Sequence, residues 1–345
     1  MRAMSAVLEL VELGMPWIGL DPFIFTVHHV DHYPAGNDIQ GPAAPLVGRM
    51  LGSDFSYRDG WSMYHGKRVP GFPQHPHRGF ETVTVVRKGF IDHSDSLGAT
   101  ARFGRGDTQW LTAGGGIQHS EMFPLVSTTG PNELELFQIW LNLPPRSKMV
   151  PPYFRMLWSE EIPTIVAGGG QATIDVIAGH LAGHRAPSPP PDSWASQTAT
   201  DFGIWLIRIA PDGAWTLPGA PSGINRMLHF FDGDEVDVAG TRLGKDTGVR
   251  LRDEADAPIR NHGGPAEFLL LQGRPIGAPV FQMGPFVMNT PEEISQAMID
   301  YRTTAFGGWA WPTIEPVHDR TQGRFAIHAD GRVEHRDLTE AEVNA

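Results

Sequence analysis

The chain has 345 residues and contains no cysteine. Disulfides, iron–sulfur clusters, zinc knuckles and thiol nucleophiles are therefore excluded. No uncharged apolar run approaches the length of about 18 residues that a membrane-spanning helix needs. The N-terminal segment would be a poor signal peptide, because Glu9 and Glu12 interrupt its apolar positions. Basic residues are scarce, with 27 Lys and Arg against 39 Asp and Glu, so no broad nucleic-acid surface is expected. These absences favour a soluble, cytoplasmic protein that binds neither membranes nor nucleic acid directly.

Turn-forming residues, by contrast, are abundant, with 40 glycines and 30 prolines. Between them stand short β-branched, aromatic and aliphatic runs, the pattern of strands in a β-sandwich or barrel. The clearest runs are residues 81–86, 134–143, 203–209 and 268–271. Only a turn near 159–162 and residues 291–303 favour helix; before the second, Thr290 can cap the N-terminus. We predict an all-β protein with a few short helices.

One polar, proline-rich segment without strand periodicity divides the chain. It covers residues 183–202 and includes the string RAPSPPP, which is typical of a linker. We expect an N-terminal domain at 1–182, the linker at 183–202, a C-terminal domain at 203–305 and an extension at 306–345. The extension is expected to pack on, or trail from, the C-terminal domain.

Two separate segments carry candidate metal ligands. His75 and His77 stand two residues apart in GFPQHPHRGF, and His119 and Glu121 stand two apart in GIQHSEM. In extended backbone each pair points to one face of its strand. Three imidazoles and a carboxylate on facing strands would suit Fe(II), Mn, Ni, Co or Cu, and an octahedral ion would keep two open positions.

Chance is the competing explanation for the first pair. With 15 histidines in the chain, a single His-x-His pair is weak evidence. The second pair follows the turn Gly114–Gly116, which lacks the Lys-Ser/Thr of a phosphate loop. We interpret these glycines as allowing the backbone to approach a metal-binding strand closely.

Longer strings around these residues resemble the pirin family of the cupin superfamily. The strings are HPHRGFETVT at 75–84, DTQWLTAGGGIQHSEM at 107–122, FQIWLNLPPRSKMVPPYF at 137–154 and GPFVMNTPEEISQA at 284–297. The similarity covers about residues 18–305. It implies a bicupin, that is, two cupin-type β-barrels of which the N-terminal one holds a metal and the C-terminal one has lost its ligands.

The resemblance also implies a site and an activity. Pirins bind iron through residues that fall here on His75, His77, His119 and Glu121, with Fe(II) as the expected cofactor. Some pirins cleave the flavonol quercetin with dioxygen, which implies a quercetin 2,3-dioxygenase-type enzyme with a small planar aromatic substrate and Glu121 as ligand and candidate catalytic base. Other pirins act as transcriptional co-regulators, so the alternative is a non-enzymatic, iron-dependent redox sensor that binds a protein partner.

Several further residues near the motifs have simpler interpretations. We interpret Glu81 as a hydrogen-bonding partner rather than a ligand, His93 and Asp95 as part of a solvated hairpin, and His180 and His184 as linker surface. We expect His28, His29 and His32 in loops or at strand ends. The core is the expected place of Phe72, Phe80, Trp110 and Met122, with an apolar substrate pocket as the alternative.

Overall fold

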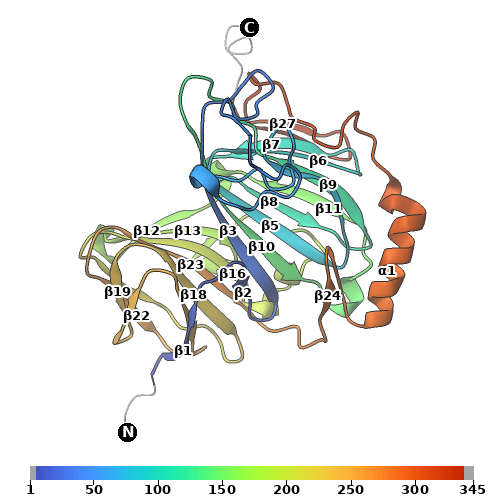
Figure 1. Ribbon diagram of the computed structural model, residues 1–345. Helices are drawn as coiled ribbons and strands as arrows, with labels where there is room; N and C mark the ends of the chain where they lie inside the picture. The colour runs from blue at the N-terminus through green and yellow to red at the C-terminus, as the bar shows by residue number, and fades with distance from the viewer. Residues whose placement is uncertain (1–4, 338–345) are drawn as a thin grey trace. The chain divides into compact units, whose positions relative to one another are not determined.

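The computed structural model describes residues 5–337 of the chain (Figure 1). The chain forms two compact units. The smaller unit comprises the chain up to Val27, residues 139–144 and residues 160–277; the larger comprises residues 28–138, residues 145–159 and the chain from Ala278 onward. Within the described part of the chain, no helix is long and apolar enough to cross a membrane.

Two sheets form the larger unit. The strand order of the first is β27 (Val333–His335), β26 (Phe325–Ile327), β7 (Thr100–Gly104), β6 (Phe90–Asp95), β9 (Ile117–Met122) and β4 (Gly71–His77). The order of the second is β11 (Tyr153–Leu157), β8 (Thr108–Thr112), β5 (Phe80–Lys88), β10 (Asn132–Asn142), β3 (Phe23–Tyr33) and β2 (Trp17–Ile18). The unit boundaries fall within β3 and β10, and β2 belongs to the smaller unit. Alternate residues of these strands supply a buried apolar core that includes Val86, Phe103, Leu111 and Phe154.

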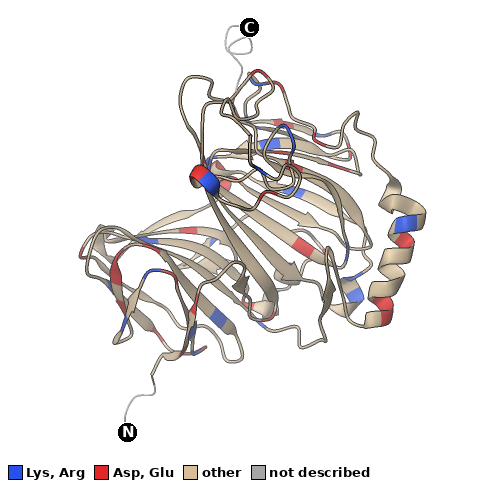
Figure 2. Cartoon of the chain, in the orientation of Figure 1, with Lys and Arg blue, Asp and Glu red and all other residues tan. Residues whose placement is uncertain are grey.

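A hairpin and a helix complete the larger unit. The hairpin consists of β24 (Phe281–Met283) and β25 (Phe286–Met288), and the helix is α1 (Pro291–Thr304), which runs beside β24 in Figure 1. Thr290 and Glu293 form a capping box at the start of α1, and Figure 2 shows the acidic residues of its first turn. The short 3-10 turns of the larger unit are η1 (Arg58–Gly60), η2 (Pro145–Ser147) and η7 (Ala305–Gly307), and η3 (Ser159–Glu161) lies across the boundary to the smaller unit.

The smaller unit contains a seven-stranded and a four-stranded sheet. The first has the order β1 (Val7–Glu12), β21 (Thr247–Leu251), β18 (Asn225–Asp232), β23 (Ala266–Gly273), β16 (Gly203–Ile209), β13 (Ala172–Ala178) and β12 (Thr164–Ala167). The second has the order β17 (Ala214–Leu217), β22 (Ala257–Asn261), β19 (Glu235–Val238) and β20 (Thr241–Gly244). A separate pair, β14 (His180–Leu181) with β15 (His184–Arg185), and the turns η4 (Gly168–Gly170), η5 (Trp194–Ser196) and η6 (Thr198–Thr200) complete it. Its own apolar core includes Ile174, Trp205, Leu228 and Phe268.

The predicted secondary structure is confirmed. The four predicted strands correspond to β5, β10, β16 and β23, and the two predicted helical stretches to α1 and η3. The compact units, however, do not follow the expected domain ranges, because residues 160–182 and the N-terminal strand β1 group with residues 203–277, and the proline-rich segment lies inside the same unit. Strand β13 explains this grouping, since it pairs with β16 over residues 172–178.

The C-terminal extension does not pack on the expected domain. Its strand β26 pairs with β7 of the larger unit, with Phe325 opposite Arg102. Arg102 also donates hydrogen bonds to the carbonyl oxygens of Asp319 and Gln322, at 2.8 and 2.9 Å. This placement is favoured because β26 covers an edge of β7 that would otherwise be unpaired, and because the buried guanidinium of Arg102 needs hydrogen-bond acceptors. Residues 338–345 of the expected extension lie outside the described residues.

Candidate metal centre

The strand register brings the three predicted histidines together. His75 of β4 lies directly opposite His119 of β9, and a bulge in β4 lies between Phe72 and His75. Because side chains alternate along a strand, His77 shares the face of His75. One ligand nitrogen from each of the three imidazoles lies within 4.8 Å of the others. These residues could hold a metal ion.

Burial sets the protonation state of this cluster. It lowers the pKa of His75 to about 4 and holds the pKa values of His77 and His119 well below the ordinary value for histidine. The imidazoles are therefore neutral at pH 7, the form in which histidine binds a metal. Within the described residues neither ring nitrogen of His119 has a hydrogen-bond partner, an arrangement that costs free energy unless something else contacts them.

Glu121 lies beside the cluster. Its Oε2 atom is 3.9 Å from Nε2 of His119. Thr84 donates a hydrogen bond to Oε1 at 3.1 Å, and Gln138 donates one to Oε2 at 2.6 Å. Burial nevertheless raises the pKa of Glu121, and these two donors oppose that shift. In the described chain, the group of mutually close ligand atoms contains the three histidines without Glu121.

His93 and Asp95 are not in a solvated hairpin, so that prediction was wrong. Both are fully buried in β6, where His93 pairs with Glu121 and Asp95 with His119 across the ladder. Nε2 of His93 lies 3.1 Å from a carboxylate oxygen of Asp95, and its ring centroid is 5.5 Å from that of His119. The alternation of polar residues was visible in the sequence, but burial depends on the sheets that surround β6.

A C-terminal segment supports His77 from behind. Nδ1 of His77 lies 3.4 Å from the carbonyl oxygen of Pro285, and the amide of Val287 donates to the carbonyl of Arg78 at 3.0 Å. The guanidinium of Arg78 donates to the carbonyl of Gly115 at 2.7 Å and to Asp300 of α1 at 2.6 Å. These contacts join the strand that carries His77 to the hairpin, to α1 and to the glycine turn.

The glycine turn allows one close approach. A Cβ atom on Gly116, whose φ is +135°, would lie 2.6 Å from the ring of Phe306. The guanidinium of Arg78 stacks over the same ring, with 4.5 Å between Cζ and the ring centroid. The glycines thus permit tight packing against residues that support β4, and no phosphate loop is formed, since β9 rather than a helix follows the turn.

Lys148 is a buried amine that sequence reasoning missed. Its Nζ donates hydrogen bonds to the carbonyl oxygens of Gly79 and Val287, at 2.7 and 3.0 Å. Burial lowers the pKa of Lys148 to about 7. The side chain thus joins the turn after His77 to β25, and no spacing in the sequence marks this role.

An ordered loop and two aromatic rings lie beside the site. Tyr64 donates to Asp31 at 2.7 Å and lies 2.9 Å from Nδ1 of His29, and its ring stacks on Phe72 with centroids 5.3 Å apart. Phe72 is half-buried, and its ring centroid is 6.4 Å from that of His75. Phe72 is therefore a candidate contact for a substrate.

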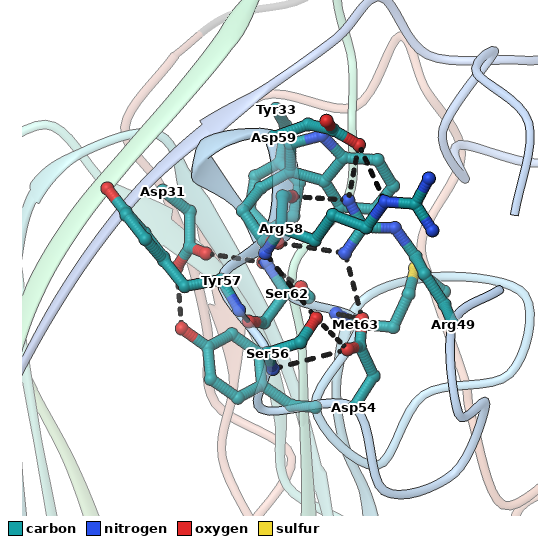
Figure 3. Close-up of polar contacts among 12 residues, drawn as sticks. Asp31, Tyr33, Arg49, Asp54, Ser56, Tyr57, Arg58, Asp59, Ser62 and Met63 are labelled. Carbon is teal, nitrogen blue, oxygen red and sulfur yellow. Dashed lines mark hydrogen bonds and ion pairs between the residues drawn. The ribbon is translucent and has the colours of Figure 1, made fainter.

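A buried arginine orders the loop that carries Tyr64. Figure 3 shows Arg49 bonded to Asp54, which also accepts a hydrogen bond from the amide of Met63. The guanidinium of Arg49 stacks over Trp61 at 3.3 Å from the ring centroid. These contacts fix the backbone immediately before Tyr64.

The other candidates are not part of the cluster, although the ring centroid of Phe80 lies 5.0 Å from that of His77. Thr112 donates a hydrogen bond to Glu81 at 2.6 Å, and Glu81 faces away from the side of β5 that carries Thr84. His180 and His184 are exposed, as predicted, whereas His28 and His29 lie within β3 rather than in a loop, which corrects that expectation, and His32 lies near its end. Phe80, Trp110 and Met122 are fully buried core residues.

Comparisons with known proteins agree with this architecture. Two family models match the chain: Pirin at residues 47–141 and the Pirin C-terminal cupin domain at residues 204–307. A Pseudomonas aeruginosa protein named "Putative quercetin 2,3-dioxygenase" is 36% identical over 241 residues, which cover 68% of this chain and 79% of that protein. A pirin-like protein from Caulobacter vibrioides is 36% identical over 272 residues, which cover 77% of this chain and 90% of the relative. The crystal structure of quercetin 2,3-dioxygenase from Acinetobacter baumannii is similar with a TM-score of 0.70 and 27% identity, covering 89% of this chain and 99% of that one.

The strand topology and these matches define a protein with two cupin domains. The histidine cluster lies within the residues matched by the first family model. The chain belongs to the pirin family.

Proposed function

We propose that this chain is a metal-dependent dioxygenase of the quercetin 2,3-dioxygenase type, which opens a flavonol ring with dioxygen. The proposal assigns Fe(II) as the metal and His75, His77, His119 and Glu121 as its ligands. One observation carries it: three imidazoles, of which His77 and His119 are buried and His75 is half-buried, offer ligand nitrogens within 4.8 Å of one another. The names of the Pseudomonas and Acinetobacter relatives support the reaction class.

The residues fit a divalent first-row metal ion. Neutral imidazoles with one carboxylate are a donor set suited to Fe(II). A metal ion would contact a nitrogen of His119 that has no hydrogen-bond partner within the described residues, which offsets the cost of burying it. Glu121 lies close enough to His119 to join as a fourth ligand after a small side-chain movement.

Glu121 is also the candidate base. When bound, the metal ion would act as a Lewis acid and a template for the flavonol and dioxygen. The flavonol 3-hydroxyl must lose its proton to become an electron-rich reactant, and a glutamate whose pKa is raised by burial accepts a proton more readily than an exposed one. Thr84 and Gln138 hold the two carboxylate oxygens in place while Phe72 offers an aromatic face to the planar substrate.

The test is dioxygen consumption and flavonol bleaching by the full chain reconstituted with Fe(II). The wild type is compared with the double variant His75→Ala/His119→Ala, and His180→Ala/His184→Ala is the matched control because both of its histidines are exposed and lie outside the cluster. We expect turnover in the wild type and the control and loss of both iron and turnover in the cluster variant. A wild type that binds iron but neither consumes dioxygen nor bleaches flavonols would overturn the enzyme proposal and favour a binding protein.

A single variant separates the two roles of Glu121. If Glu121→Gln retains iron but loses turnover, Glu121 acts as the base, and if it loses iron, Glu121 is chiefly a ligand. Normal iron binding with full turnover in Glu121→Gln removes Glu121 from the reaction.

A further inference from the structure

A cavity of about 600 Å³ lies in the larger unit, outside the histidine cluster. Its walls are residues 311–313 and 315–318 of the C-terminal extension together with Ile39, Gln40, Arg68, Val69 and Ser94. The volume falls in the range of roughly 300–1,000 Å³ that is typical of small-molecule sites. We call residues 308–324 the strap.

The strap is fixed to the sheet beneath it. Trp311 donates from its indole nitrogen to the carbonyl of Asp95 at 2.8 Å, and the amide of His318 donates to Asp92 at 2.8 Å. Gln40 donates to the carbonyl of His318 at 2.7 Å. Because both ends of this wall are bonded to the sheet or its loops, the cavity is preformed, which lowers the entropy that a ligand must lose on binding.

The strap lies outside the residues that the two family models match, whereas Arg68, Val69 and Ser94 lie inside the first range. The two models match residues 47–141 and 204–307.

Two opposite charges line the cavity and remain separate. Within residues 5–337, no carboxylate lies within 4.0 Å of the guanidinium of Arg68, and no hydrogen bond is made by this group. Glu315 accepts a hydrogen bond from the amide of Lys67 at 3.2 Å through one oxygen. The second carboxylate oxygen and the whole Arg68 guanidinium are thus available to a ligand.

The rest of the lining is mainly apolar. Ile39, Val69, Trp311 and Pro316 supply aliphatic and aromatic surface. Arg68 is exposed and Glu315 is half-buried, so a ligand with only one charge would contact only one of these two groups. A ligand with both charges and an apolar body would satisfy all three parts of the lining.

We propose that this cavity binds a small zwitterion with an apolar body, of which an aromatic α-amino acid is the simplest form. The ligand carboxylate accepts hydrogen bonds from Arg68, and its ammonium group donates to Glu315. Its ring packs against Trp311 and Val69. The proposal does not depend on metal binding or on dioxygenase activity.

The test is calorimetric titration of the metal-free full chain with three probes: L-phenylalanine, 3-phenylpropionate, which lacks the ammonium group, and phenethylamine, which lacks the carboxylate. Metal-free protein is used so that no carboxylate can bind to a metal ion. We expect the Kd of phenylalanine to be at least about tenfold lower than that of either partial probe, since each lacks one charge-assisted contact.

Two charge variants test the two proposed contacts separately. Arg68→Met should weaken phenylalanine and 3-phenylpropionate by at least about tenfold and leave phenethylamine unchanged, whereas Glu315→Gln should weaken phenylalanine and phenethylamine and leave 3-phenylpropionate unchanged. Arg146→Met is the matched control, because Arg146 is exposed in the same unit and does not line the cavity.

Three outcomes overturn the proposal. They are no heat of binding for phenylalanine at millimolar concentration, equal affinity for phenylalanine and 3-phenylpropionate, and an equal loss of affinity in Arg146→Met. Arg68→Lys guards against a folding defect, since it keeps the charge without the bidentate geometry and should retain part of the affinity.

Discussion

Nδ1 of His77 lies 3.4 Å from the carbonyl oxygen of Pro285, which follows it by 208 positions in the chain. A hydrogen bond from Nδ1–H to this carbonyl favours one tautomer of His77 and leaves Nε2 as the lone-pair donor. The hairpin and α1 thus support the proposed site, which accounts physically for the long string at 284–297 that resembles pirins.

Arg78→Met should weaken metal binding without removing a ligand. Arg78 joins β4 to Gly115 and to Asp300, so its loss should loosen the orientation of His77 and raise the Kd for Fe(II) about 10- to 100-fold. Anaerobic titration measures the Kd. The control is Arg302→Met on α1, the helix that carries Asp300. The less disruptive Asp300→Asn should have a smaller effect, because the bond from Arg78 to Gly115 persists. An unchanged Kd in Arg78→Met, with Fe(II) bound normally by the wild type, would show that the hairpin does not orient the site.

Gln138→Leu should raise the pH below which metal binding weakens. Gln138 donates a 2.6 Å hydrogen bond to Glu121, whose pKa is already raised by burial. Loss of a donor to the carboxylate raises the pKa further, so the metal competes with a proton up to higher pH and Kd increases on the acidic side. Gln109→Leu is the matched control: the Gln109 side chain is buried in the same unit and has no hydrogen-bond partner within the described residues. The two variants are compared by metal titration between pH 5 and pH 8, and coincident curves would contradict the prediction.

Glu81→Gln should leave metal affinity within about twofold of the wild type, since Glu81 lies on the other face of β5 and bonds Thr112. Its effect should appear in stability, as a loss of about 1–3 kcal/mol, because the substitution changes the acceptor of a fully buried hydrogen bond. Metal titration and thermal unfolding of the same samples separate the two effects. A fall in affinity with Glu121 intact would make Glu81 part of the site.

Lys148→Met should change how stability depends on pH. Burial lowers the pKa of Lys148 from 10.5 to about 7, so between these values the unfolded chain binds more protons than the folded one. The contribution of Lys148 to the free energy of unfolding therefore becomes more favourable to the folded state as pH rises from about 7 towards 10, by at most about 1.4 kcal/mol per pH unit. The difference in unfolding free energy between the wild type and Lys148→Met should grow from pH 7 to pH 9 in denaturant titrations. A difference that stays constant over this range would show that Lys148 keeps an ordinary pKa in the folded protein.

Local patterns in the sequence determined the all-β class, the capped helix α1 and the pairing of ligand types two residues apart. These features depend on backbone periodicity and on capping chemistry within a few residues, and the cap at Thr290 formed as predicted. The resemblance to pirins, which rests on long separate strings, also supplied the candidate residues His75, His77, His119 and Glu121.

Tertiary structure alone decided what surrounds those residues. His93 and Asp95 are buried by strands that meet only after folding. The same holds for the two donors to Glu121, which are Thr84 and Gln138. It also holds for the carbonyl of Pro285, which lies behind His77. The strap shows the same limit: its bonds to Asp92 and Asp95 join residues more than 200 positions apart, with no periodicity to relate them. A short-range pattern in the sequence predicts on which face of a strand a side chain lies. The residues that contact it there depend on how distant strands pack.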